Sequence, residues 1–268
     1  MRMDLETVVL KKEQGVATIT LNRPNRLNAL NRSLARDVAT ALNDIKGDSK
    51  VRVVVVTGAG RGFCAGGDFK GDDKALPGTK LKPAEFVGMY RGEIGPVILG
   101  LQGCHVPTIA MVNGPAYGIG FDIALACDMR IGSDQARFCV AWLRRAIIPA
   151  GGTTWLLTRQ IGLGRAAEII FTGREVGAEE AERLCIMNRM VPAGNLEEET
   201  MELARHLAGM GPIALMMTKI NLYRHLQVDL PAALDMLAGY QAFVLHTDDH
   251  AEADKAFWEK RAPVFQGR

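Results

Sequence analysis

Short apolar runs alternate with turns and helical segments through the first half of the chain. Val8–Leu10 and Val16–Leu21 predict two strands of a hairpin, because both runs are apolar and a charged turn ending in glycine separates them. Apolar positions recur at helical spacing between Ser33 and Ile45, which predicts a helix capped by Asn28 or Asn31. Val51–Thr57 is a continuous β-branched run, typical of a strand that is buried on both faces.

The same order of elements is repeated further along. A helix predicted over Ala84–Gln102, weakened at Gly95-Pro96, precedes a buried strand over Pro107–Val112. A Gly-rich turn then leads directly into a helix over Phe121–Ala126, which is followed by a strand over Met129–Ile131. Strand, turn and helix in this alternation predict an α/β core with crossover connections.

From Gly152 onward the apolar spacing is helical almost throughout. The chain is therefore predicted to divide into an α/β part over residues 1–200 and a helical part over residues 201–268. The helices expected in this half are Thr153–Ile161, Arg165–Thr172, Ala178–Leu184, Glu197–Gly209, Ile213–Leu226, Leu230–Leu245 and Asp248–Arg261.

Charge and composition exclude several classes of partner. Among 268 residues, 32 Lys and Arg face 30 Asp and Glu without any block of like charge, so we expect no nucleic-acid partner. No apolar run has membrane-spanning length and the N-terminus lacks a signal-peptide core, so we expect no membrane partner. The 5 cysteines form no CxxC pair and no metal-ligand spacing with the histidines. We therefore expect reduced thiols, no metal and a cytoplasmic location.

Two Gly-rich turns, each directly after a buried strand, are the main candidates for chemistry. They run over Arg61–Phe69 and Asn113–Asp122. Glycine allows the backbone to adopt positive φ and to approach a ligand closely. N–H groups at the start of a helix have no partner within it and lie at its positive end. Two such turns brought together would direct two N–H groups at one developing oxyanion. The alternative is that both are tight turns without a chemical role.

The two turns resemble the signature segments of the crotonase (enoyl-CoA hydratase/isomerase) superfamily. Phe63–Asp68 is similar to the family's F-C-A-G-x-D segment, and Asn113–Asp128 is similar to its second signature. Further similarities follow in family order over nearly the whole chain, at Arg23-Pro24, Asn28–Leu30, Val55–Gly58, Ala136–Phe138, Pro149–Gly152, Leu156–Arg159, Thr172–Arg174, Ala178–Ala181 and Phe257–Arg261.

The resemblance implies an α/β fold of the crotonase (ClpP-like) type, a spiral of ββα units with a C-terminal helical region for trimerisation. It implies an acyl-CoA substrate, no cofactor beyond the coenzyme A moiety of that substrate, and a homotrimer or a dimer of trimers. By position, the oxyanion-hole N–H groups are those of Gly67 and Ile119. Coenzyme A contacts are implied at Arg26, Leu27, Ala65, Asp68, Phe69, Phe257 and Lys260.

Some of these residues have simpler interpretations. Asp68 is read as an organiser of the turn rather than as a catalyst. Phe257 and Lys260 lie on the last predicted helix, where family members close the coenzyme A site, sometimes from a neighbouring subunit. On residue type alone, Phe257 would pack against a helix and Lys260 would be a solvated charge.

The acid/base positions depart from the hydratase pattern. Family hydratases place two glutamates around the double bond, where they position water and pass its proton to the α-carbon. Those positions correspond to Asp122 and to Trp142, which cannot titrate, and a third acid position falls at Ala150. We predict Asp122 as the general acid/base, with Glu93 as a second candidate. The alternatives are that Asp122 complements its own helix dipole, by about 0.3–1 kcal/mol, and that Glu93 is a solvated or helix-paired carboxylate.

Hydration of a 2-enoyl-CoA is the favoured activity. Double-bond isomerisation is an alternative, as is hydrolysis of a thioester or C–C bond. Trp142 is assigned to the acyl pocket, because it resembles a tryptophan that faces the aromatic acyl group in 4-halobenzoyl-CoA dehalogenases, although it would equally suit the core. That likeness favours a bulky or cyclic acyl group. The two missing acids leave open a catalytically silent homologue that only binds acyl-CoA.

Overall fold

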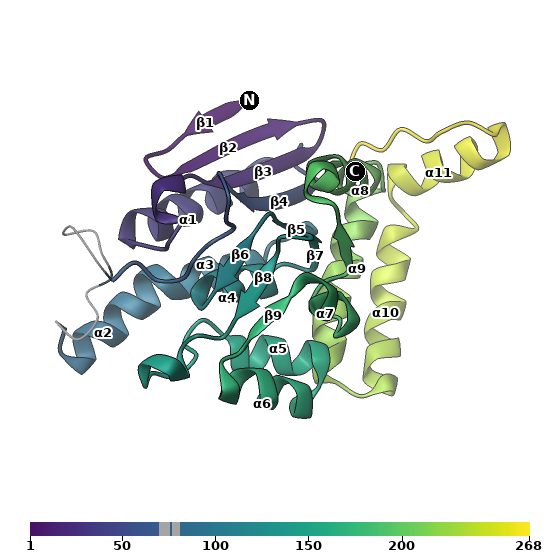
Figure 1. The fold of residues 1–268 in the computed structure, drawn as a ribbon. Coiled ribbons are helices and arrows are strands. Elements are labelled where there is room, and N and C mark those ends of the chain that lie inside the picture. Colours follow the sequence, from purple (N-terminus) through teal and green to yellow (C-terminus); the bar gives the residue numbers. More distant parts are fainter. Residues whose placement is uncertain (70–75, 77–80) are drawn as a thin grey trace.

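A seven-stranded sheet forms the centre of the computed structural model, which describes residues 1–69, 76 and 81–268 (Figure 1). The spatial order of the strands is β1-β2-β3-β4-β5-β7-β10. Strands β1 to β3 pair antiparallel, whereas β3 to β10 pair parallel in that order. Their bounds are β1 Arg2–Asp4, β2 Val8–Glu13, β3 Val16–Leu21, β4 Val53–Gly58, β5 Thr108–Val112, β7 Met129–Ser133 and β10 Arg189–Val191.

Strand β4 is buried along its whole length because both faces of the sheet are covered. Val54 and Val56 pack in the larger core, which includes the apolar face of helix α1 (Arg32–Lys46). Val53 and Val55 point the other way, into a second core beneath helix α8 (Leu196–Ala208). The predicted hairpin, the predicted strands at β4 and β5 and the first predicted helix are confirmed. Asn31 caps that helix, since its Oδ1 accepts the N–H of Leu34 at 2.9 Å.

A smaller sheet lies beside the first and carries part of the candidate site. Strand β6 (Pro115–Tyr117) pairs parallel with β8 (Arg137–Cys139), and β8 pairs antiparallel with β9 (Glu175–Gly177). Strands β9 and β10 correct the prediction that the chain is helical almost throughout after Gly152. Each has three residues, which is too short for a period-two pattern to be recognised.

The helix predicted over residues 84–102 is confirmed, but it is not regular. It consists of α2 (Pro83–Met89), a π-helical turn (Tyr90–Ile94) and α3 (Gly95–Gln102). Pro96 is accommodated in the first turn of α3, where a missing N–H costs little.

The remaining helices also lie close to their predicted positions. In the described residues none is long and apolar enough to cross a membrane, and no group of His, Cys, Asp and Glu there is arranged to hold a metal ion. These remaining helices are α4 Ile119–Ala126, α5 Thr153–Ile161, α6 Leu163–Thr172, α7 Ala178–Arg183, α9 Pro212–Arg224, α10 Leu230–Val244 and α11 Asp248–Glu259.

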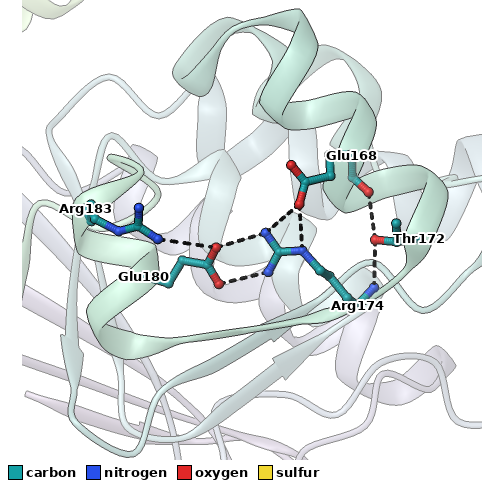
Figure 2. A network of polar contacts seen from close by, with 5 residues as sticks. All are labelled: Glu168, Thr172, Arg174, Glu180 and Arg183. Atoms are coloured by element: carbon teal, nitrogen blue, oxygen red, sulfur yellow. Dashed lines mark hydrogen bonds and ion pairs between the residues drawn. The ribbon is translucent and has the colours of Figure 1, made fainter.

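Arg174 ties helix α6, strand β9 and helix α7 together (Figure 2). Its guanidinium donates two hydrogen bonds to Glu180 on α7, at 2.8 and 2.9 Å, and one to Glu168 on α6 at 3.0 Å. Arg183 reaches the same Glu180 only at 3.7 Å. Two carboxylates therefore share one guanidinium at the junction.

Helices α9 and α10 stand side by side at the edge of the body, and α11 extends away from it (Figure 1). Lys219 of α9 anchors this region, since its Nζ lies 2.7 Å from Asp128 and donates to the carbonyl of Val106 at 2.9 Å. The Tyr223 hydroxyl donates to the same carboxylate at 2.6 Å. The boundary predicted at residue 200 falls inside α8, which packs on the sheet.

Candidate active site

The two Gly-rich turns lie against each other. Cys64 and Ala116 form a parallel bridge, in which the Tyr117 N–H donates to the Cys64 carbonyl at 2.9 Å and the Cys64 N–H donates to the Pro115 carbonyl at 3.0 Å. A Cβ on Gly120 would stand 2.0 Å from that Cys64 carbonyl oxygen, so only glycine permits this approach. The sheets thus bring together segments that are about fifty residues apart in the sequence.

Each predicted oxyanion-hole N–H directly follows a glycine of positive φ. Gly66 has φ +105° and Gly118 has φ +50°. The Ile119 N–H begins helix α4 and therefore has no partner within it. Across the described part of the chain, neither the Gly67 nor the Ile119 N–H donates a hydrogen bond to another protein group. Both N–H groups are free to meet a ligand.

Gly67 and Ile119 line one pocket of about 180 Å³. Its described walls are largely apolar, and Arg145 is the one charged side chain among them. The residues that line it are Ala65, Gly66, Gly67, Phe69, Tyr117, Gly118, Ile119, Ala141, Trp142, Arg145 and Ile147. The arrangement can receive an apolar group and hydrogen-bond an oxygen that carries developing negative charge.

The turn at residues 24–28 packs against the first Gly-rich turn. Leu27 and Asn28 both have positive φ, at +49° and +56°, and the Ala65 N–H donates to the Leu27 carbonyl at 2.9 Å. The Asn28 amide donates to the carbonyls of Ala59 and Gly62. Of the residues assigned to coenzyme A, Leu27 and Ala65 are therefore in contact, and Arg26 is exposed beside them on a 3₁₀ turn.

Asp68 has a structural partner. The buried carboxylate accepts a hydrogen bond from Arg23 at 2.8 Å, and the same guanidinium donates to the Ala29 carbonyl. This geometry supports the interpretation of Asp68 as an organiser of the turn. Phe69, the next residue, does reach the pocket.

Comparison with known proteins agrees with this geometry. The sequence profile of the enoyl-CoA hydratase/isomerase family matches residues 11–268. The chain belongs to the enoyl-CoA hydratase/isomerase family. A probable enoyl-CoA hydratase of Rhodobacter capsulatus is 35% identical over 99% of this chain and 100% of that protein. A 1,2-epoxyphenylacetyl-CoA isomerase of Escherichia coli K12 is 34% identical over 98% of this chain and 100% of that protein.

Solved structures show the same fold. An enoyl-CoA hydratase from Bacillus anthracis superposes with a TM-score of 0.89 at 34% identity, covering 98% of this chain and 100% of that one. An enoyl-CoA hydratase subunit from Geobacillus kaustophilus gives 0.90 at 34% identity, covering 99% and 100%. The predicted family and the predicted crotonase fold are confirmed. Because relatives at similar identity are named as hydratases and as an isomerase, membership in the family does not decide the reaction.

Asp122 in this enoyl-CoA hydratase/isomerase family member is completely buried. Its Oδ1 accepts a hydrogen bond from the Thr153 hydroxyl at the start of helix α5, and its Oδ2 has no hydrogen-bond partner. A Cβ on Gly151 would stand 2.1 Å from Oδ2 and 2.5 Å from Ile119 Cδ1, so the carboxyl and the Ile119 side chain both touch the Gly151 backbone. Asp122 is not among the described residues that line the pocket.

Burial raises the pKa of Asp122 from its ordinary value of 3.8 to about 7. The Thr153 hydroxyl and the nearby N–H groups of Thr153 and Gly151 act in the opposite direction, since each stabilises the carboxylate. The net result is a carboxyl group that gains and loses its proton near neutral pH.

Glu93 is held elsewhere. Arg32 of α1 donates to both of its carboxylate oxygens, with Nε at 3.0 and 2.8 Å. This ion pair links α1 to the π-helical turn, and Glu93 does not line the pocket. The paired-carboxylate alternative for Glu93 therefore has direct geometric support.

Trp142 does line the pocket. Its half-buried indole lies over Gly118, where a Cβ would be 3.7 Å from the ring. The indole Nε1 is buried and has no hydrogen-bond partner. Trp142 therefore contacts the residue that precedes the Ile119 N–H.

Phe257 and Lys260 lie apart from this pocket within one chain. Phe257 is 75% exposed, and Lys260 ends α11 with φ +54°. Neither is among the residues that line the pocket.

Tyr117 and Arg145 are two pocket residues that were not expected from the sequence. Tyr117 lines the pocket, and its hydroxyl donates to Glu175 on β9. Arg145 lies with its guanidinium carbon 4.8 Å from the centre of the Phe69 ring. Their positions in the sequence were the signal that could have assigned them to the site. Tyr117 precedes the second glycine of its turn, and Arg145 follows Trp142 by about one helical turn.

Proposed function

We propose that the protein binds an acyl-CoA thioester and hydrates a 2-enoyl-CoA. The enolate formed in this reaction is stabilised between the N–H groups of Gly67 and Ile119. The observation that supports this most directly is that two unpartnered N–H groups, each preceded by a glycine of positive φ, line the same pocket. Donors fixed in such a site are worth about 10²–10³ in rate each. They polarise the thioester carbonyl, so that water can add at the β-carbon.

Asp122 is the proposed acid/base. A carboxyl group of pKa about 7 both donates and accepts a proton at neutral pH. In hydration the hydroxyl of water bonds to the β-carbon, and a proton is delivered to the α-carbon of the enolate. Asp122 shares the first turn of α4 with the Ile119 N–H, but its carboxyl group does not line the pocket, so transfer of the α-carbon proton needs a relaying water or a shift of the Ile119 side chain.

Double-bond isomerisation is the second candidate. Trp142 and Ala150 stand at the other two acid positions, so Asp122 is the single carboxyl of the family's acid/base set. One group that removes a proton from one carbon and returns it to another is sufficient for a double-bond shift, whereas hydration must also position water. Hydrolysis of a thioester or C–C bond, on a bulky or cyclic acyl-CoA, uses the same oxyanion site.

A panel of straight, branched, alicyclic and aromatic enoyl-CoA esters distinguishes these reactions. Hydration abolishes the absorbance of the conjugated thioester and adds the mass of one water. Isomerisation changes the absorbance at constant mass, and thioester hydrolysis releases free coenzyme A. Tight binding without any change would identify a silent acyl-CoA-binding protein instead.

Ile119→Pro tests the oxyanion site itself. Proline is tolerated at the first position of a helix and removes the N–H there. We expect kcat to fall by about 10²–10³, because one of two donors is lost. Ile119→Ala keeps the N–H while removing the side chain, and it should retain most of the turnover. Equal rates in the two variants would contradict an oxyanion role.

We propose a homotrimer, or a dimer of trimers, as the working form, and exposed apolar side chains of the C-terminal helices support self-association. Helix α10 buries only Ala233 against its own chain, while several of its large apolar side chains remain exposed. These are Leu230, Leu234, Leu237 and Phe243. Burial against another copy would remove this surface from water, and we propose that Phe257 and Lys260 then help to close a coenzyme A site. The proposed location is the cytoplasm.

A further inference from the structure

Arg145 is held at the pocket by a well-defined turn. Its N–H donates to the Trp142 carbonyl at 3.0 Å, and the next residue, Ala146, adopts φ +54° and donates to the Leu143 carbonyl at 3.0 Å. This 3₁₀ turn follows Trp142 directly, so the two side chains enter the pocket from one short segment.

The exposed guanidinium of Arg145 lies over an aromatic ring and pairs with no carboxylate of the described residues. It lies 4.8 Å above the Phe69 ring, a cation–π contact that leaves its N–H groups free for an acceptor in its plane. Other arginines of the body, such as Arg23 and Arg32, pair with carboxylates. Within the described residues, no carboxylate forms an ion pair or hydrogen bond with Arg145. The side chain is exposed, so water solvates this charge in the free protein and the guanidinium stays available to a ligand.

The described residues around the pocket supply no negative charge to Arg145. None of the described lining residues is acidic. Glu175 accepts the Tyr117 hydroxyl and lies 3.9 Å from Arg137, and Asp122 is turned toward Thr153. The apolar walls would penalise a carboxylate that met no cation or donor. Among the described residues that line the pocket, Arg145 is therefore the group able to pair with a negatively charged acyl group.

We propose that Arg145 selects acyl-CoA esters whose acyl group ends in a carboxylate, an inference that rests on the proposed function. A guanidinium binds carboxylates and phosphates alike. We favour the carboxylate because Arg145 belongs to the segment of Trp142, which is assigned to the acyl group. The residues assigned to coenzyme A, such as Arg26 and Ala65, come from other segments. A contact with a coenzyme A phosphate is the competing role.

The test compares esters of equal length that do not react. Adipoyl-CoA carries a terminal carboxylate, hexanoyl-CoA ends in a methyl group, and the terminal amide of adipoyl-CoA matches the carboxylate in size without its charge. We expect calorimetric titration of the protein to show adipoyl-CoA binding about 5- to 20-fold more tightly than the other two. The ratio should fall as salt is added, because the ion pair is partly exposed.

Arg145→Gln should reduce this ratio to about one while leaving the affinity for hexanoyl-CoA unchanged. Arg144→Gln is the matched control, since Arg144 is the adjacent exposed arginine on the same turn and does not line the pocket; it should keep the preference. A preference absent from the wild type, or unchanged in Arg145→Gln, overturns the proposal. So does equal weakening of both esters and free coenzyme A, which assigns Arg145 to the carrier. Failure of the wild type to bind hexanoyl-CoA at all would count against the proposed function instead.

Discussion

Asp122 lies between two helices. It stands in the first turn of α4, as expected, but its carboxyl group meets the start of α5 through Thr153. The N-terminus of α5 is positive, so this position partly offsets the cost of burying a carboxylate. The alternative prediction was that Asp122 complements the dipole of its own helix, α4. In the structure its carboxyl group also meets the positive end of a different helix, α5. That contact depends on the tertiary fold and could not be predicted from local spacing.

The titration of Asp122 should appear in the stability of the protein. Its pKa is raised by burial, so the folded state binds a proton between pH 4 and pH 7 that the unfolded state has already lost. The stabilisation from protonated Asp122 is complete below about pH 4 and disappears as pH rises through about 7. Over that window we expect the wild type to lose on the order of 4 kcal/mol relative to Asp122→Asn.

Urea unfolding of both proteins at a series of pH values measures this difference. The Asn side chain stays neutral, so it provides the reference for the protonated acid. A difference in free energy of unfolding that does not change between pH 4 and pH 8 would show that Asp122 remains charged when buried.

Gly151 is expected to tolerate no side chain. A Cβ there would lie 2.1 Å from Asp122 Oδ2 and 2.5 Å from Ile119 Cδ1, both in a packed interior. We expect Gly151→Ala to lower the free energy of unfolding by about 1–3 kcal/mol and to reduce turnover. Gly164→Ala is the control, because a Cβ at Gly164 in helix α6 meets nothing within 4 Å. It should stabilise slightly. Thermal melts and turnover of the two variants provide the measurement.

The candidate site was only partly predictable at the level of residues. Gly67 and Ile119 were found because both signature segments are continuous in sequence, and the structure places them in one pocket; their chemical role stays a prediction. The partners of Asp68 and Glu93, namely Arg23 and Arg32, carried no recognisable signal. Arg23 and Asp68 are 45 positions apart in the sequence, and Arg32 and Glu93 are 61 positions apart. Only the fold brings these residues together.

Among the elements, prediction succeeded where periodicity was long. The helices from α5 to α11 were placed to within about two residues, and the longer ones, such as α8, α9 and α10, repeat their apolar spacing over several turns. Strands β6, β8, β9 and β10 have three residues each, and they form because their backbones find partners in distant segments. The helix predicted over residues 84–102 contains a π-helical turn that no local pattern indicated.

The junction of α6, β9 and α7 should depend on the planar fork of Arg174. Lysine at this position keeps the charge but cannot hold Glu168 and Glu180 with three directed hydrogen bonds. We expect Arg174→Lys to lower the free energy of unfolding by about 1 kcal/mol. Arg183→Lys should change it by less, since Arg183 is 74% exposed and 3.7 Å from Glu180. Equal effects in chemical denaturation would contradict a special role for Arg174.

For the molecule as a whole, the fold followed from a resemblance spread over nearly the entire chain. Local patterns alone indicated an α/β core and a helical end. They did not give the order of the strands, because pairing between distant segments is decided by packing on both faces of the sheet. A single chain leaves apolar side chains uncovered in the region of α9 and α10, where Leu222, Leu226 and Leu230 are exposed to solvent.

Self-association through α10 is the expected consequence. We expect sedimentation to give a trimer or a multiple of three, and Leu234→Asp to shift the population toward smaller species, because a charge would be buried at the interface. Leu234→Met keeps the apolar surface and should leave the mass unchanged. A wild type that sediments as a monomer at micromolar concentration would rule out the proposed assembly.

The contact between Lys219 and Asp128 limits how the protein can be shortened. Asp128 is a partly buried residue between α4 and β7, and in the described residues its ion-pair partner comes from a helix near the other end of the chain. A fragment that stopped before α9 would lose both this ion pair and the hydrogen bond from Tyr223, and it would uncover the surface on which α9 packs. We therefore expect that trimming the helical tail yields an unstable polypeptide rather than a smaller enzyme.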